Sequence, residues 1–390
     1  MKNHVSNYYD LMTFGLGDVS FQQFVDRFQL KYNELNVEGF NWDPEIQLDY
    51  TYEQLIGSLN IATLPVYVDE ASEGLDKSFG SFQIGSNRIP TQKHRYPVSA
   101  KMMREQMIMY NRFGAASLTG QTRDALRDLL FDSTDKLIAG NRNALTHQRM
   151  KIASTGQFTI DLENNPRGLK GLTFDFGVKT KETLTTTARW WTNAEHTTAN
   201  EGAASDPLLY LKNKAKAARK AGYPAFHFEM AQDLFDDLLM HSAVLKRIGF
   251  AAYPAATDAT ALSYAQNMTD EAKKDAIQRI VGVEIKTYDS LAAVEKFDEE
   301  TKGIKPVTIE NFKSTNVSLV PNGQIGTIKS VQPMVFTDDP TQRIAWFDGG
   351  RTLITNRFEA KTKTMYVESE MAVLCVPNMP QYMQIYTVTV

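Results

Sequence analysis

Apolar residues recur at helical spacing in an early, otherwise polar stretch of the chain. Ser20 followed by Gln23 has the form of a capping box, which starts a helix. The apolar residues of the next turns fall on one face, namely Phe21, Phe24, Val25, Phe28 and Tyr32. A stripe this apolar must be covered, either by the rest of the same chain or by a neighbouring subunit. The sequence leaves both alternatives open.

The longest helical pattern begins near Thr122 and predicts a helix over about 122–152. Its apolar stripe has near-heptad spacing and consists of Leu126, Leu130, Phe131, Leu137, Ile138, Ala144 and Leu145. A helix of about 30 residues is about 45 Å long at the standard rise. A coiled coil is the alternative, but the stripe covers few heptads.

Three further helices are predicted. Asp206 as N-cap, Pro207 in the first turn and Gly222 beyond the end delimit the first. The second is expected over about 230–248 and the third over 269–281. The first helix carries five basic residues, Lys212, Lys214, Lys216, Arg219 and Lys220. They indicate a solvated face, or else a surface that meets an acidic neighbour.

Alternating apolar residues predict a two-stranded ribbon over 64–98, which Pro65, Pro90 and Pro97 confine to edge-type pairing. A two-stranded ribbon has only marginal stability by itself in water, so we expect this one to pack on another surface. The simpler interpretation is an ordinary surface hairpin. Further strands are predicted at 158–161, 172–178, 283–288, 307–309, 316–320, 364–367, 372–376 and 382–390. This mixture of elements indicates an α+β protein with interleaved domains.

Composition narrows the function classes. The 390 residues suffice for one large or two medium domains. The 42 basic and 46 acidic residues give a net charge of −4, which provides no basic field for tight nucleic-acid binding, so sequence-specific DNA binding is not expected. Aromatic residues make up 11% of the chain, and many lie outside core patterns, which indicates contact surfaces or, alternatively, an aromatic-rich core.

The single cysteine and the lack of membrane signals point to a protein that folds in a cytoplasm. Cys375 lies in the apolar run 371–376 and is expected to be a buried small hydrophobe rather than a nucleophile. No apolar stretch approaches the roughly 18 residues of a membrane span. The N-terminus lacks the basic-then-apolar order of a secretion signal.

Motifs for catalysis or cofactor binding do not stand out. The sequence has neither GxxxxGK[ST] nor a GxGxxG after a strand, and none of its six histidines lies in an HExxH motif. The nearest approach to an acid–base cluster is His241 with Asp233, Asp236 and Asp237, which acidic residues near a helix start explain better. We therefore expect no enzyme and predict no catalytic residue, cofactor or metal site. An enzyme of unknown class on an α/β domain is the least favoured hypothesis.

Four segments carry a family resemblance. They are TRDALRDLLFDSTDKLIAGNRNALTHQRMKIASTGQFTI at 122–160, the helix–strand–helix pattern at 206–248, VSLVPNGQIGTIKSVQP at 317–333, and the strand-rich C-terminal tail. The first resembles a spine helix running into a strand, and the second resembles the opening of an axial domain. Together they resemble the major capsid proteins of tailed bacteriophages, which have the HK97-like fold, and within these the lambda-type head proteins (major capsid protein E family).

The resemblance implies an N-terminal arm at 1–63, an extended E-loop at 64–98, a peripheral (P) domain at 99–205 and 334–390, and an axial (A) domain at 206–333. The spine helix belongs to the peripheral domain. It further implies pentamers and hexamers of an icosahedral shell, found in the virion and assembled in the host cytoplasm. The implied partners are copies of the same chain, portal and scaffold proteins, a decoration protein, and packaged double-stranded DNA held non-specifically; no membrane is implied.

The arm and the E-loop supply the candidate inter-subunit contacts, which are Phe21, Phe24, Phe28, Trp42, Glu73, Lys77, Phe79 and Phe82. Some capsids of this fold are cross-linked through a lysine, an asparagine and a glutamate. Lys77, Asn356 and Glu359 could take these roles, but the lambda-type resemblance argues against a cross-link. The alternative function is the shell of an encapsulin-type nanocompartment, which has the same fold but encloses a cargo enzyme rather than a genome.

Overall fold

The computed structural model describes most of the chain. The described residues are 21–32, 37–57, 82–98, 104, 108, 120–166, 171–289, 291–300, 302–335, 342–359 and 364–390. They fall into two compact units, each made of three stretches of chain. Unit 1 comprises 1–52, 87–145 and 327–375, and unit 2 comprises 53–86, 146–326 and 376–390. The chain therefore leaves each unit and returns to it.

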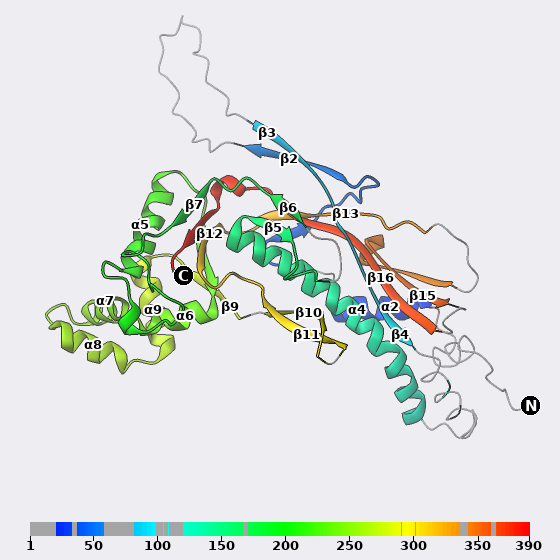
Figure 1. Ribbon diagram of the computed structural model, residues 1–390. Helices are drawn as coiled ribbons and strands as arrows, with labels where there is room; N and C mark the ends of the chain where they lie inside the picture. Colours follow the sequence, from blue (N-terminus) through cyan, green and yellow to red (C-terminus); the bar gives the residue numbers. More distant parts are fainter. Residues whose placement is uncertain are drawn as a thin grey trace, which may run out of the picture. The chain divides into compact units, whose positions relative to one another are not determined.

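Unit 1 is built on a six-stranded sheet. Five strands follow the order β1-β13-β16-β15-β14, and β4 also pairs with β16. Their bounds are β1 Phe40–Trp42, β4 Thr91–Val98, β13 Gly326–Val331, β14 Gln342–Phe347, β15 Thr352–Glu359 and β16 Thr364–Pro377. The helix α2 (Phe21–Tyr32) confirms the predicted early helix and packs against β14 (Figure 1). The proposed cap, Ser20, lies outside the described residues.

The burial pattern of β16 explains its central place in unit 1. Its side chains alternate between buried and half-buried over 364–371, as expected for a sheet covered on one face, and every side chain over 371–376 is buried. Cys375 belongs to this run and is 0% exposed, which confirms the predicted buried thiol. Pro97 lies on β4, which pairs on one side only among the described strands, as proline requires.

The 36-residue helix α4 (Gly120–Thr155) confirms the predicted long helix. Residues up to Leu145 belong to unit 1 and the last turns belong to unit 2. Within unit 1 the helix buries Leu137 and Ile138, and Asn141 Nδ2 donates a hydrogen bond to Ser369 Oγ at 2.9 Å. The described part of the heptad-like stripe thus packs within the fold.

Unit 2 contains a five-stranded mixed sheet in the order β7-β17-β12-β8-β9. The strands are β7 Thr180–Thr183, β8 Phe226–Ala231, β9 Ile285–Tyr288, β12 Asn316–Pro321 and β17 Gln384–Thr387. β12 is antiparallel to β8 and β17, whereas the two outer pairs are parallel. β8 and β12 are buried along their whole length, which makes them the centre of the unit.

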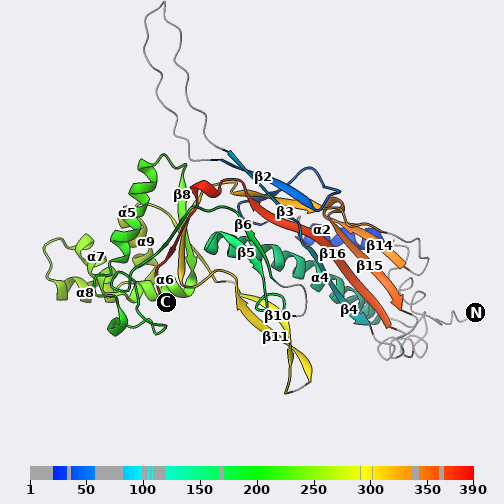
Figure 2. The ribbon, with the colours of Figure 1, turned by 45° about the horizontal axis from the view of Figure 1, so that its top comes forward.

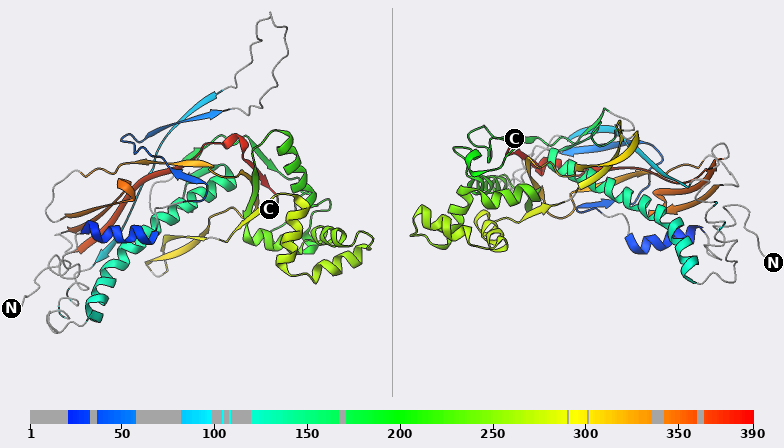
Figure 3. Two further views of the ribbon diagram at one scale, coloured as in Figure 1. Left: turned by 180° about the vertical axis from the view of Figure 1, so that it is seen from behind. Right: turned by 60° about the horizontal axis from the view of Figure 1, so that its bottom comes forward.

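Five helices of the described chain accompany this sheet (Figure 3). They are α5 Pro207–Lys220, α6 Gln232–Met240, α7 Ser242–Ala252, α8 Asp258–Gln266 and α9 Asp270–Val281. The predicted cap of α5 is confirmed, because Asp206 accepts a hydrogen bond from the Leu209 N–H at 3.1 Å. Gly282 ends α9 at a φ of 75°, a conformation that glycine adopts without strain. Trp190 and Trp191 are buried in the core that the helices and the sheet share.

The helix predicted over 230–248 was wrong in its extent. Met230 lies inside β8, and the chain breaks at His241 between α6 and α7. Both helices have apolar residues at helical spacing, so the periodicity of the sequence predicted one continuous helix. Helix α8 was not predicted, because it buries only Ala261 and Ala265 and has no large apolar stripe.

Three two-stranded ribbons complete the described fold: β2–β3, β5–β6 and β10–β11. Their strands are β2 Thr51–Gly57, β3 Phe82–Arg88, β5 Gln157–Ile160, β6 Leu172–Asp175, β10 Leu291–Asp298 and β11 Gly303–Glu310. The sequence placed 51–57 in the arm, yet these residues form the strand that pairs with β3 (Figure 2). β4 joins the sheet of unit 1 instead, and the strand predicted near 64–68 lies outside the described residues. No helix in the described part of the chain is long and apolar enough to cross a membrane.

Candidate functional site

The predicted contact residues of α2 are covered by their own unit. Phe21 and Phe24 are buried, and their ring centroids lie 6.2 Å apart. Since α2 packs against β14, the described part of the apolar stripe is buried on the chain's own body, which was one of the two alternatives. Phe28 is placed in α2 by its backbone alone.

Trp42 ends β1 in a small charged cluster of unit 1. The guanidinium carbon of Arg351 lies 5.0 Å from the centroid of its ring, and Arg351 also donates to the carbonyl of Asp43 at 2.8 Å. The Asp43 carboxylate pairs with Lys329. Burial alone would raise the pKa of Asp43, but the hydrogen bond from Lys329 helps to hold it below its usual value. Trp42 is half-buried and its contact with another subunit stays a prediction.

The remaining predicted contacts belong to the ribbon. Glu73, Lys77 and Phe79 lie outside the described residues, and Phe82 begins β3 and is placed by its backbone alone. Of the suggested cross-link partners, Asn356 is 1% exposed within β15. Its side chain is therefore inaccessible to a lysine of a neighbouring loop in this conformation.

His241 joins a serine and a carboxylate in unit 2. Its side chain is buried, Ser205 Oγ lies 3.1 Å from Nε2, and a carboxylate oxygen of Glu201 lies 4.0 Å from Nδ1. These three residue types make up the nucleophile, base and orienting acid of many hydrolases. The sequence missed this arrangement, because Ser205 and Glu201 precede the histidine by more than thirty residues.

The hydrogen bonds of His241 do not fit a base that activates Ser205. The backbone N–H of Ala243 donates to Nδ1 at 3.2 Å, so the ring proton is on Nε2, where a base would need its lone pair. Glu201 is engaged elsewhere, since it accepts from the backbone and the hydroxyl of Ser242. His241 and Glu201 thus cap the start of α7.

Burial lowers the pKa of His241, while Glu201, the carbonyl of Trp190 and Asp206 act in the opposite direction. The imidazole also meets the ring of Trp191 edge-on, with 5.4 Å between centroids. A lowered pKa favours the neutral ring. The neutral ring is the form that accepts the Ala243 N–H, so electrostatics and geometry agree on a capping role.

The aspartates that precede His241 in the sequence are exposed or paired with another residue, so the acid–base hypothesis that the sequence disfavoured gains no support. Asp237 pairs with Nδ1 of His196 at 2.5 Å, and the His196 ring stacks on Trp191 with 4.6 Å between centroids. Asp233 and Asp236 are exposed on α6. Sequence proximity placed the four residues on one helix, but the break after Met240 separates them.

A buried ion pair ties the last turns of α4 to the centre of the unit 2 sheet. Arg149 and Glu229 of β8 are 1% and 0% exposed and make a bidentate contact, with 2.9 Å between Nη1 and Oε2. His227 and Tyr288 also bond to the Glu229 carboxylate, at 2.9 and 3.0 Å. Burial alone would raise the pKa of Glu229, but Arg149 and His227 outweigh it and hold the pKa at about 2. The full set of partners identifies a structural network.

The β10–β11 hairpin presents an exposed apolar surface that the sequence analysis did not find. Because side chains alternate across a strand, Leu291, Phe297 and Ile304 share one face. We call this face the hairpin outer face; it comprises Leu291, Ala293, Glu295, Phe297, Ile304, Pro306, Thr308 and Glu310. All eight residues are exposed, and the three large apolar ones are 64%, 54% and 50% exposed. Ala292 and Ile309, on the other face, are buried.

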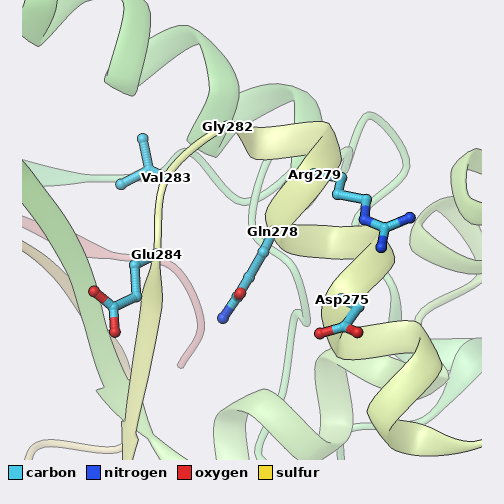
Figure 4. A pocket seen from close by; sticks show the side chains of 6 residues that line it. All are labelled: Asp275, Gln278, Arg279, Gly282, Val283 and Glu284. Carbon is cyan, nitrogen blue, oxygen red and sulfur yellow. The ribbon is translucent and has the colours of Figure 1, made fainter.

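A hollow at the end of α9 offers no convergent site. Figure 4 shows its lining, in which the charged side chains of Asp275, Arg279 and Glu284 point apart rather than toward one centre. The carbonyl of Gly282 at its rim accepts from Arg219 at 2.6 Å. Within the described residues, no group of three or more histidine, cysteine or acidic side chains is placed to hold a metal ion.

No protein-family model matches the sequence, and no curated protein matches it. Among solved structures, the chain is similar to a phage-related protein from Bordetella bronchiseptica RB50, at 12% identity over 97% of this chain and 96% of that chain, with a TM-score of 0.46. It is also similar to the satellite phage P4 procapsid (9% identity, 93% and 99% covered, TM-score 0.45) and to the capsid of cyanophage P-SCSP1u (10%, 92% and 88%, 0.42). These likenesses are distant. Their descriptions name phage capsids or a phage-related protein.

Proposed function

We propose that this chain is the major capsid protein of a tailed bacteriophage, which assembles into pentamers and hexamers of an icosahedral shell around a double-stranded DNA genome. The observation that carries the proposal is the order of its elements. After α2 and β1 come the ribbon β2–β3 and the strand β4, the 36-residue helix α4 follows, an α/β unit comes next, and the C-terminal strands return to both sheets. The resemblance to HK97-like capsid proteins implies this order.

The segments that carry the resemblance fall on the elements that it implies. Residues 122–160 lie on α4 and β5, and residues 206–248 lie on α5, β8, α6 and α7. The segment 317–333 lies on β12 and β13, joined by a turn in which Gly323 has a φ of 84°. This turn position needs a left-handed backbone conformation, which glycine adopts without strain, and this explains the glycine of the Pro-x-Gly turn.

In this proposal α4 is the spine helix, and 206–333 form the axial domain. Residues 99–205 and 334–390 form the peripheral domain, 1–63 supply the arm, and 64–98 serve as the E-loop, whose strand β3 pairs with β2 at the end of the arm. A two-stranded ribbon cannot bury an apolar face by itself, and lying across a neighbour would cover it. Many repeated contacts of this kind make a shell stable as a whole although each is modest.

The charge balance also suits a container. A strongly basic lining would hold DNA phosphates tightly and oppose release of the genome, whereas this chain has a net charge of −4. The role is structural in this proposal. The serine–histidine–carboxylate arrangement at His241 supports it, because its histidine serves as a helix cap.

The test is to purify the chain, with and without the products of the adjacent genes, and to examine it by negative-stain electron microscopy and sedimentation. We expect closed icosahedral particles or sheets of five- and six-fold rings. Scaffold, portal and decoration proteins would be recognised among the neighbours by their effect on particle yield and size. Packaged DNA would support the phage capsid, and an enclosed enzyme would instead support the encapsulin-type shell. A stable small oligomer under every condition would contradict both.

A further inference from the structure

The hairpin outer face exposes large apolar side chains that a hairpin by itself cannot bury. Phe297 and Ile304 lie directly opposite each other in the ladder, so their side chains form one apolar patch near the turn. Leu291 extends the apolar surface to the base of the hairpin. The opposite face buries only Ala292 and Ile309, and its Val307 is 42% exposed. A two-stranded ribbon with so little burial is marginally stable in water, which indicates that the hairpin outer face is covered in the working form of the protein.

The charge of the hairpin restricts what can cover it. Residues 291–310 contain five carboxylates and three basic residues, and two of the carboxylates, Glu295 and Glu310, belong to the outer face. A matching surface must therefore offer apolar area together with positive charge.

Helix α5 of the same chain offers such a surface. It has five basic residues and no acidic one. Its exposed positions Leu209, Lys212, Lys216 and Lys220 are spaced at three and four residues, so they form one stripe along the helix. Lys214 is engaged elsewhere, since it pairs with Glu182. The stripe therefore combines an exposed leucine with three lysines.

The two surfaces cannot meet within one molecule. Figures 1 and 2 show α5 on one side of the five-stranded sheet of unit 2 and the hairpin on the other. We propose that the hairpin outer face of one copy packs on the α5 stripe of a second copy. This contact deepens the proposed function and rests on it. Because the two surfaces differ, the contact is head-to-tail and repeats from copy to copy, as a ring of subunits requires.

The lone cysteine makes a direct test possible. Cys375 is 0% exposed, so the unmodified chain should not react with a short bis-maleimide. The double variant Phe297→Cys/Leu209→Cys is assembled, treated with the bis-maleimide and analysed by denaturing electrophoresis. We expect a ladder of covalent multimers, because each copy can link to two others. The matched control is Lys296→Cys/Leu209→Cys, which moves the thiol to the adjacent exposed residue on the opposite face of β10 and should give little or no ladder.

Three results would overturn the inference. Dimers from Phe297→Cys alone would mean that two hairpins meet each other. Particles without any ladder in the double variant would show that the contact is absent although the shell forms, which leaves the proposed function intact. A chain that stays monomeric in every condition would remove both proposals together.

Charge reversal gives a second readout that does not depend on cross-linking. Lys212→Glu/Lys216→Glu should reduce particle yield at least tenfold without unfolding the subunit, since both residues are exposed. Adding Glu295→Lys/Glu310→Lys should restore most of the yield, because the same two charges are exchanged across the contact. Loss of assembly that the exchange leaves unrestored would contradict the pairing of these two surfaces.

Discussion

Gln22 of α2 pairs with both backbone groups of Trp346, as a neighbouring strand would. Its Nε2 donates to the Trp346 carbonyl at 2.7 Å, and the Trp346 N–H donates to its Oε1 at 2.7 Å. Trp346 lies on β14, the last strand of the unit 1 sheet. An exposed strand edge invites pairing with other chains, so one glutamine protects part of this edge.

Gln22→Glu should therefore destabilise unit 1. The carboxylate cannot donate, and it is held against a carbonyl oxygen, so we expect a loss of about 1–3 kcal/mol in the free energy of unfolding. Urea unfolding of the unassembled subunit measures it. Asn213→Asp adds the same charge at an exposed position of α5 and should change stability by less than about 0.5 kcal/mol. Equal losses in both variants would show that the pairing with Trp346 is unimportant.

Breaking the Arg149–Glu229 pair from one side should be costly. Glu229→Leu leaves a buried guanidinium without its carboxylate, and we expect a loss of about 3–5 kcal/mol. Arg149→Met/Glu229→Leu removes both charges and should recover most of that loss, because apolar residues can fill the same volume. Denaturant unfolding of the three proteins forms the comparison. A double variant at least as unstable as Glu229→Leu would refute the explanation by uncompensated charge.

The same pair should make unit 2 sensitive to acid. The pKa of Glu229 is about 2 in the folded chain against an ordinary 4.5, so the unfolded chain binds the proton more readily. The carboxylate therefore contributes stability above about pH 4.5 that is lost as the pH falls toward 2, on the order of 3 kcal/mol. Glu229→Gln should flatten the fall in the urea midpoint across this window. Glu310→Gln, at an exposed position, is the control and should leave the slope unchanged.

His241 should give a second pH dependence at higher pH. Its pKa is lowered by burial, so the unfolded chain takes up a proton first as the pH falls below the ordinary 6.5, and stability is lost from there downward. His241→Asn keeps an oxygen acceptor for the helix start but does not titrate, and it should reduce this loss. Glu201→Gln should steepen it, because Glu201 favours the charged ring. Unfolding midpoints between pH 8 and 5 test both directions, and a variant slope equal to the parent's would count against this role.

Gly156 marks the sharp passage from α4 into β5. It has a φ of 72°, and an added Cβ would lie 2.9 Å from Val178 Cβ and 3.0 Å from Ile385 Cδ1. Gly156→Ala should cost more than about 2 kcal/mol, since backbone strain and a clash combine. Gly171→Ala meets the same strain at a φ of 82° but has no neighbour within 4 Å, so it should cost only about 1 kcal/mol. Thermal unfolding separates the two, and equal losses would remove the steric part of the explanation.

Elements whose signals are local could be predicted from the amino-acid sequence. The cap at Asp206, the glycine after α9 and the length of α4 follow from residues within a few turns of each other, and the structure confirms each. The buried run around Cys375 could also be predicted, because a continuous apolar stretch is expected to lie in the core. The α+β class follows from these elements together.

Contacts between residues far apart in the sequence could not be predicted and became visible only in the folded chain. Periodicity could not show that the chain breaks at His241, because both neighbouring helices have the same apolar spacing. Nor could it find the partners of Glu229 or Ser205, since charge and hydroxyl groups are common along the chain. The exposure of the hairpin outer face could not be predicted either. An apolar residue on a strand gives the same sequence pattern whether or not another element covers it, so only the folded chain distinguishes the two cases.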